Sequence, residues 1–126
     1  MKLLIVDDEE LTRTGVISSL DWSSLGIDEV IQADDGVHGL ETARLYKPEI
    51  ILCDVRMPRM DGDEATREIR ALDRPDAATL PIIAETADAF EEGQRRARDA
   101  GMTALTTKPL NIHELVALLA EYIPEK

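Results

Sequence analysis

Five short apolar runs, separated by segments long enough for a helix, are the feature that most constrains this chain. In runs such as Leu-Leu-Ile-Val the apolar residues follow one another without alternation, which is typical of parallel strands buried on both faces. Four runs are rich in branched residues and the fifth is weaker; they cover Lys2–Val6, Glu29–Ala33, Glu49–Cys53, Leu80–Ala84 and Thr103–Thr106. The pattern predicts a parallel sheet between layers of helices.

The intervening segments show helical spacing of apolar residues. The first apolar stripe includes Leu11 and the second includes Leu45. Gly101 is placed to end the fourth helix, and Asn111 with Glu114 three residues later resembles a capping box. The predicted helices cover about Leu11–Leu20, Val37–Leu45, Gly62–Leu72, Asp88–Ala100 and Asn111–Tyr122.

Strand followed by helix, five times over, predicts an α/β domain whose crossovers are right-handed. The apolar pattern leaves the order of the strands open between two common doubly wound arrangements. The chain has 126 residues, which suits one compact domain, and it shows no linker or low-complexity segment. We therefore predict a single domain over residues 1–126.

Composition excludes several functional classes. The chain carries 26 acidic and 14 basic residues, a formal net charge of −12, which argues against direct binding of nucleic acid or of an anionic membrane. A lone cysteine, Cys53, excludes an internal disulfide. The longest apolar run, residues 115–120, is too short to span a membrane, and the apolar N-terminus is too short for a signal peptide. We expect a cytoplasmic protein.

Polar residues stand where the predicted strands end. Asp7 and Asp8 follow the first strand, Asp54 follows the third, Thr86 comes after the fourth and Lys108 after the fifth. In a parallel sheet the carboxyl ends of the strands share one edge, where ligands bind. We therefore expect three carboxylates, a hydroxyl and an ammonium group to converge there.

Such a cluster suits phosphoryl transfer. Packed carboxylates repel one another unless a cation lies between them, and Mg²⁺ prefers oxygen ligands. A carboxylate can also act as a nucleophile and form an aspartyl phosphate. Lys108 could offset the charge of a transferring phosphoryl group and Thr86 could donate a hydrogen bond to it, which is the support this reaction requires.

The motifs together resemble the receiver domain of two-component response regulators. They are Leu-Leu-Ile-Val-Asp-Asp-Glu at residues 3–9, Asp-Val-Arg-Met-Pro-Arg-Met-Asp-Gly at 54–62, Thr-Ala at 86–87 and Lys-Pro at 108–109. The resemblance covers essentially the whole chain in order. The run at 54–62 is the most specific of the four, because an acidic pair after a strand or a Lys-Pro pair is common by itself.

The resemblance implies a role for each matching residue. Asp54 is the phosphoacceptor, and Thr86 and Lys108 contact the phosphoryl group once it is bound. Asp8 and Asp54 hold Mg²⁺ directly, Asp7 holds it through water, and the backbone carbonyl of Arg56 completes the protein ligands. The domain catalyses only its own phosphorylation and dephosphorylation, so it is a signalling domain and not an enzyme in the ordinary sense.

The resemblance also implies the fold and the partners. The fold is flavodoxin-like, a five-stranded parallel sheet in the order 2-1-3-4-5 with helices on both faces, and the Lys108–Pro109 bond is cis. The phosphodonor is a sensor histidine kinase or a phosphotransfer protein, and the output is a downstream effector or a fused domain. A homodimer through the fourth helix, the fifth strand and the fifth helix is a further expectation, as is a receiver that either stands alone or is excised from a longer protein.

Two features depart from the commonest receiver pattern. Leu105 stands three positions before Lys108, where receivers usually carry Tyr or Phe, so coupling through an aromatic side chain is in doubt. Arg56 and Asp88 lie two positions beyond Asp54 and Thr86, respectively. We hypothesise that they form an ion pair across the mouth of the site and slow dephosphorylation.

Two other functions fit parts of the sequence. A phosphatase of the haloacid dehalogenase type also uses an aspartyl phosphate on a doubly wound sheet, but it needs Asp-x-Asp-x-Thr/Val after the first strand, and residues 7–10 read Asp-Asp-Glu-Glu. An interaction module with a vestigial site is the other alternative. It is disfavoured because every expected site residue is present.

Overall fold

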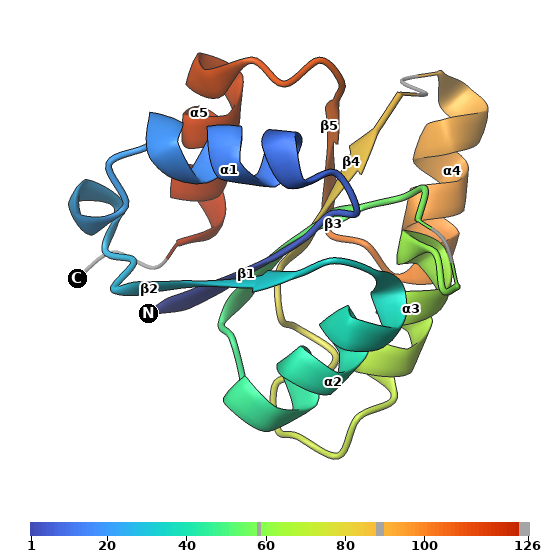
Figure 1. The fold of residues 1–126 in the computed structure, drawn as a ribbon. Helices are drawn as coiled ribbons and strands as arrows, with labels where there is room; N and C mark the ends of the chain where they lie inside the picture. Colours follow the sequence, from blue (N-terminus) through green and yellow to red (C-terminus); the bar gives the residue numbers. More distant parts are fainter. Residues whose placement is uncertain (58, 88–89, 124–126) are drawn as a thin grey trace.

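The structure is a computed structural model that describes residues 1–57, 59–87 and 90–123. Within these residues strands and helices alternate along the chain (Figure 1). The strands are β1 (Lys2–Val6), β2 (Glu29–Ala33), β3 (Ile50–Asp54), β4 (Ile82–Thr86) and β5 (Ala104–Thr107). The helices are α1 (Glu10–Ser19), α2 (Gly36–Tyr46), α3 (Gly62–Arg70), α4 (Glu91–Ala100) and α5 (Ile112–Tyr122), with a 3₁₀ turn, η1, at Ser23–Leu25.

The strands form one parallel sheet in the order β2-β1-β3-β4-β5, so the predicted order 2-1-3-4-5 is confirmed. The register pairs Val6 with Ala33 and with Cys53, Asp54 with Glu85, and Thr86 with Thr107. Because all neighbouring strands run in the same direction, the residues after β1, β3, β4 and β5 meet at one edge of the sheet.

Helices cover both faces of the sheet (Figure 1). Helices α1 and α5 pack on one face, where Leu3, Leu52 and Ile83 belong to the same buried cluster as Leu115. Helices α2, α3 and α4 pack on the other, against alternate residues of the same strands. Both central strands, β3 and β4, are buried along their whole length, as their unbroken apolar runs predict.

Strands β3 and β4 extend further in the structure than the sequence predicts. β3 ends at Asp54 and β4 at Thr86, whereas the sequence predicted ends at Cys53 and Ala84. The ladder continues because its hydrogen bonds come from the backbone, so Val55 N–H still donates to Glu85 O at 3.0 Å. Both site residues therefore lie within the sheet, in its last row.

The first two predicted helix stripes are each wrong at one residue, while Ile17, Leu20, Leu40 and Ala43 do face the core. Leu11 is 88% exposed and Leu45 is 67% exposed, while α1 and its C-cap bury Val16 and Leu20. The pair Val16 and Leu20 is spaced by four residues, so it occupies one side of the helix and turns Leu11 to solvent. None of the helices in the described residues is long and apolar enough to cross a membrane.

The predicted helix ends at Gly101 and Asn111 are confirmed. Gly101 caps α4 in the left-handed region, with φ of 99°. Asn111 caps α5, and its side-chain oxygen accepts a hydrogen bond from Glu114 N–H at 3.1 Å. These caps orient the two helices that flank β5, the strand that leads to Lys108.

Candidate functional site

Asp54 and Lys108 form the centre of the candidate site. Asp54 is the last residue of β3 and is 3% exposed. Lys108 follows β5, and its Nζ lies 3.0 Å from Asp54 Oδ2 and 3.8 Å from Glu9 Oε1. The structure thus brings together the two residues that the sequence placed after separate strands, and it gives the buried carboxylate a cationic partner.

Three carboxyl groups meet beside this pair. Oxygen atoms of Asp7, Asp8 and Asp54 all lie within 4.8 Å of one another; Asp7 and Asp54 are buried and Asp8 is exposed. Asp7 is held from two sides, because its Oδ1 accepts from Glu9 N–H at 2.9 Å and its carbonyl oxygen accepts from Arg13 Nη1 at 2.5 Å. Hard oxygen donors at this spacing, with one of them open to solvent, fit a divalent ion such as Mg²⁺.

Burial, and to a lesser extent the nearby charge of Asp7, raise the pKa of Asp54 to about 6. The hydrogen bond and the charge of Lys108 oppose this rise. Burial of the ammonium lowers the pKa of Lys108, but the hydrogen bond to Asp54 and the charges of the nearby acidic residues together outweigh this, so the pKa of Lys108 is raised. At neutral pH Asp54 is therefore mostly ionised beside a charged Lys108, the state that a nucleophilic carboxylate needs.

Thr86 joins β4 to the segment that carries Lys108. It is 8% exposed, and its carbonyl oxygen accepts a hydrogen bond from Lys108 N–H at 2.9 Å. The Lys108–Pro109 bond is cis, as predicted. A cavity of about 210 Å³ opens at this point and is lined by Asp8, Glu9, Asp54, Val55, Arg56, Thr86, Ala87 and Lys108. All the predicted site residues except Asp7 thus line one solvent-accessible space.

The segment after β3 approaches the phosphoacceptor candidate closely. Arg56 N–H donates to Asp54 Oδ1 at 3.3 Å. Gly62, the first residue of α3, leaves no room for a side chain, because a Cβ there would lie 2.4 Å from Asp54 O and 2.9 Å from Val55 Cα. The glycine of the 54–62 motif thus permits the chain to return over the end of β3.

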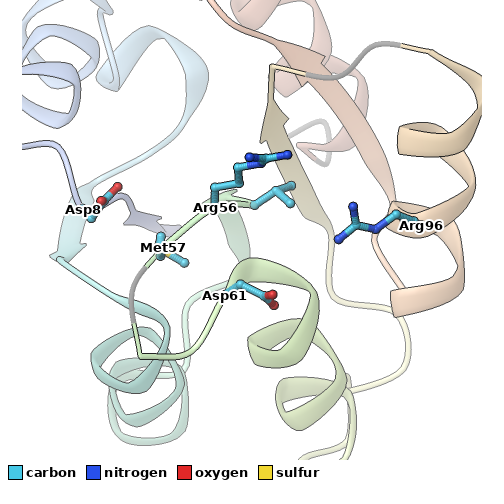
Figure 2. A pocket seen from close by; sticks show the side chains of 6 residues that line it. Asp8, Arg56, Met57, Asp61 and Arg96 are labelled. Carbon is cyan, nitrogen blue, oxygen red and sulfur yellow. The ribbon is translucent and has the colours of Figure 1, made fainter.

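A second hollow of about 340 Å³ adjoins the site and is lined by Asp8, Val55, Arg56, Met57, Asp61 and Arg96. Figure 2 shows that Arg56 comes from the segment after β3, Asp61 from the start of α3 and Arg96 from α4. Arg96 Nη2 also lies 3.4 Å from Asp63 Oδ2. Asp88 lies outside the described residues, so the ion pair between Arg56 and Asp88 stays a prediction.

The sequence analysis missed one residue of this region, Glu85. It lies in β4 beside Asp54 in the register and is 1% exposed. Burial, followed by the charge of Asp7 and a hydrogen bond with it, raises the pKa of Glu85 to about 8. An acidic residue at the end of the buried run 82–86 was the available signal, because glutamate is almost never fully buried unless it has a partner.

Residues 3–120 match the response regulator receiver domain family. Over 115 residues the chain is 36% identical to the transcriptional regulatory protein PdtaR of Mycobacterium tuberculosis, which is 91% of this chain and 53% of PdtaR. Over 122 residues it is 36% identical to the sensor histidine kinase RcsC of Salmonella typhi, which is 97% of this chain and 12% of RcsC. The chain thus spans about half, or much less, of these curated relatives.

Solved structures show the same similarity. The receiver domain of the sensor histidine kinase PA1611 from Pseudomonas aeruginosa, with a magnesium ion coordinated in its active site cleft, is 34% identical, with a TM-score of 0.82 over 97% of this chain and 96% of that domain. The chemotaxis protein CheY4 of Vibrio cholerae is 29% identical, with a TM-score of 0.84 over 96% of this chain and 97% of CheY4.

Proposed function

Because the chain belongs to the response regulator receiver domain family, and so acts as a phosphorelay receiver in two-component signalling, we propose that Asp54 is its phosphoacceptor and that the reaction requires Mg²⁺. The observation that carries this proposal is the convergence of Asp54, Lys108 and two further carboxylates at one sheet edge, with Lys108 Nζ 3.0 Å from Asp54 Oδ2. A receiver is a signalling domain, and its chemistry is confined to its own aspartate.

The acidic group fits Mg²⁺ by its donors. Asp8 and Asp54 would hold the ion directly, Asp7 through water, and the backbone carbonyl of Arg56 would complete the protein ligands. The exposure of Asp8, beside two buried carboxyl groups, leaves a path to solvent for the ion and its water ligands. When bound, the ion supplies positive charge that offsets the charge of the transferring phosphoryl group.

The protein's own groups provide the rest of the reaction. A carboxylate oxygen of Asp54 attacks the phosphorus of a phosphohistidine, the new O–P bond forms as the P–N bond breaks, and the electron pair of that bond stays with the imidazole of the donor. Lys108 then turns from the Asp54 carboxylate to a phosphoryl oxygen, and the Thr86 hydroxyl donates to another. Both residues line the cavity that opens over Asp54.

The output of this chain cannot depend on an aromatic switch at the usual position. Leu105 lies in β5 and packs, partly buried, against the core cluster that contains Ala97 and Met102. We propose that phosphorylation instead acts through Thr86 and Lys108, whose backbones are joined by the 2.9 Å hydrogen bond, and repacks α4 against β5.

The partner that donates the phosphoryl group is a sensor histidine kinase or a phosphotransfer protein, and the effector is a separate protein or a fused domain. The similarity to part of a transcriptional regulator and to part of a sensor kinase supports both forms of output. A homodimer through α4, β5 and α5 and a location in the cytoplasm stay predictions, as does the absence of direct nucleic-acid binding. The net charge of −12 supports the last of these.

Phosphorylation by a small donor tests the proposal. The protein is incubated with Mg²⁺ and acetyl phosphate, and intact mass is followed for wild type, Asp54→Asn and Asp8→Asn. We expect a gain of one phosphoryl group in wild type, no gain in Asp54→Asn, and a strongly reduced gain in Asp8→Asn or after chelation with EDTA. A phosphoryl gain that persists in Asp54→Asn contradicts the assignment.

The same incubation separates the alternatives. Rapid multiple turnover of an added phosphate ester, with no lasting phosphoprotein, is the result expected of a phosphatase of the haloacid dehalogenase type. Absence of both phosphorylation and Mg²⁺ binding is the result expected of a vestigial module. The family match and the acidic cluster support a phosphoaccepting receiver over both of these alternatives.

A further inference from the structure

The segment between β3 and α3 holds an arginine whose backbone conformation is unfavourable for its residue type. Arg59 has φ of 69°, in the left-handed region, and among the described residues only Lys47 shares this without being glycine. Lys47 caps the end of α2, where a left-handed residue is common, whereas Arg59 ends no helix. A left-handed conformation is costly for a residue with a side chain and persists where the surrounding structure holds it. The conformation of Arg59 is therefore held by contacts with the rest of the fold.

An ion pair joins Arg59 to the start of α2. Arg59 Nη1 lies 3.2 Å from Asp35 Oδ2, and the side chain of Asp35 is mostly buried while that of Arg59 is exposed. Asp35 uses its other oxygen to cap α2, because Oδ1 accepts a hydrogen bond from His38 N–H at 2.8 Å. One carboxylate thus fixes both the first turn of α2 and the segment after β3.

The backbones of the same two segments also touch. A Cβ at Gly36, the first residue of α2, would lie 2.0 Å from Met60 O and 2.7 Å from Met60 C. The absence of a side chain at Gly36 therefore admits the residue that follows Arg59 against the start of α2. The segment after β3 is thus held at Arg59 by charge and, one residue later, by close packing.

This contact lies beside the proposed cation site. The end of β2 holds the first residue of the acidic cluster, because Ala33 O accepts a hydrogen bond from Asp7 N–H at 3.1 Å. Arg56, whose carbonyl is a proposed ligand, comes three residues before Arg59 and lines the same hollow as Asp8. The ion pair therefore joins the segment that carries this carbonyl to the segment after β2, the strand that holds the acidic cluster.

We propose that Asp35 and Arg59 are positioning residues of the divalent-cation site, which together fix the segment after β3 so that the Arg56 carbonyl is presented to the ion. The inference rests on the proposed Mg²⁺ site and adds to it two residues outside the ligand set. Groups that orient metal ligands from outside commonly change metal affinity by about tenfold or more. Arg59 thus strengthens cation binding through the shape of the segment, although its own charge repels the cation.

Calorimetric titration of the metal-free protein with Mg²⁺ tests this inference through the sign of the change. If charge alone mattered, removal of a positive charge near the site would strengthen cation binding. We expect Arg59→Met instead to weaken Mg²⁺ binding about tenfold, and Arg59→Lys, which keeps a charge for Asp35, to recover most of this loss.

Arg44→Met is the matched control for this titration. It removes the same side chain from an exposed position in the last turn of α2, at the opposite end of the helix from Asp35. We expect Arg44→Met to leave the Mg²⁺ affinity within about twofold of wild type, as for a group distant from the site. A loss in Arg44→Met equal to that in Arg59→Met would overturn the inference.

A double-variant cycle tests whether the two residues act through their contact. Asp35→Asn keeps an oxygen that can cap α2 and removes the charge that pairs with Arg59. We expect Asp35→Asn to weaken Mg²⁺ binding about as much as Arg59→Met does, and the double variant to bind no more weakly than either single variant. A double variant whose loss is the product of the two single losses would show independent effects and overturn the inference.

Thermal unfolding in EDTA separates positioning from backbone strain. Arg59→Gly removes the same side chain but fits the left-handed backbone, so we expect its metal-free Tm to equal or exceed that of Arg59→Met, while its Mg²⁺ affinity falls as far. Wild-type affinity in Arg59→Gly would overturn the inference, because strain would then explain the loss in Arg59→Met. Unchanged or stronger Mg²⁺ binding in Arg59→Met would overturn it while leaving the proposed function intact. Failure of wild type to bind Mg²⁺ would overturn both.

Discussion

Lys108 Nζ and Asp54 Oδ2 lie 3.0 Å apart, although the two residues are 54 positions apart in the chain. The contact crosses β4, since Asp54 ends β3 and Lys108 follows β5. It opposes the effect of burial on Asp54, whose pKa is about 6 with Lys108 in place. The ammonium group thus keeps a buried carboxylate available as a nucleophile near neutral pH.

Removal of this ammonium should raise the pKa of Asp54. In Lys108→Met only the backbone hydrogen bond from Arg56 opposes the effects of burial and of the Asp7 charge on Asp54, so we expect its pKa to lie clearly above 6 in metal-free protein. The measurement is an NMR titration of the Asp54 side-chain carboxyl carbon. Lys108→Arg retains the charge and serves as the control, with a smaller rise. A pKa near 6 in Lys108→Met would contradict the importance of this contact.

The glycine at the start of α3 should be intolerant of any side chain. Gly62→Ala places a Cβ 2.4 Å from Asp54 O, so the end of β3 must shift. We expect a loss of about 1–3 kcal/mol in the free energy of unfolding, the usual cost of overpacking, together with slower phosphorylation by acetyl phosphate. Urea denaturation and intact mass measure the two effects.

Gly15 offers the matched control within the same protein. It lies in α1, and nothing stands within 4 Å of a Cβ built there. Gly15→Ala should therefore stabilise the protein by about 0.5–1 kcal/mol, the helix preference for alanine over glycine, without affecting phosphorylation. If Gly62→Ala and Gly15→Ala had equal effects on stability and phosphorylation, the close approach of Gly62 to Asp54 would be ruled out as the cause.

Stability of the metal-free protein should fall as pH rises. Asp54 and Glu85 have ordinary pKa values of 3.8 and 4.5, and the fold raises them to about 6 and about 8. Between these limits the folded state binds more protons than the unfolded state, so the free energy of unfolding decreases with pH. We expect a decrease on the order of 5 kcal/mol between pH 5 and pH 8.

Denaturation in urea with EDTA, at intervals from pH 5 to pH 8, measures this decrease. Glu85→Gln should remove most of the decrease in the free energy of unfolding above pH 6. Of the two groups, only Glu85 has a pKa well above 6. Parallel curves for wild type and Glu85→Gln would exclude Glu85 as the source.

Arg70 should matter for stability and not for phosphorylation. Its guanidinium donates to Leu80 O at 2.6 Å, to Gly101 O at 2.9 Å and to Ala77 O at 3.0 Å, so it ties α3 to the segment before β4 and to the end of α4. Arg70→Met leaves these carbonyl groups without their donor. We expect a loss of about 2–3 kcal/mol, since unsatisfied buried acceptors are costly.

Chemical denaturation of Arg70→Met, with the exposed Arg95→Met as control, checks this expectation. Arg95→Met should change the free energy of unfolding by less than about 0.5 kcal/mol. Phosphorylation of Asp54 at low temperature should survive both substitutions. Loss of phosphorylation in folded Arg70→Met would indicate that the hydrogen bonds of Arg70 also position the site.

The local pattern of apolar and polar residues determined much of this protein. Uninterrupted apolar runs specify strands that must be covered on both faces, and a parallel sheet then places the residues at the strand ends on one edge. Asp7, Asp8, Asp54, Thr86 and Lys108 could be assigned to that edge from the sequence for this reason. The strand order came from the resemblance of the motifs to a family, because several orders satisfy the same pattern.

Only the tertiary structure decided which groups interact within that edge. Glu85 looks in the sequence like a residue after a strand, yet the register of β3 and β4 buries it beside Asp54 and within reach of the charge of Asp7. Leu11 looks like a core residue, yet the rotation of α1 turns it to solvent. Periodicity records the spacing along one element, whereas burial and pKa depend on the position of each element relative to its neighbours, and that position is set by packing between residues far apart in the chain.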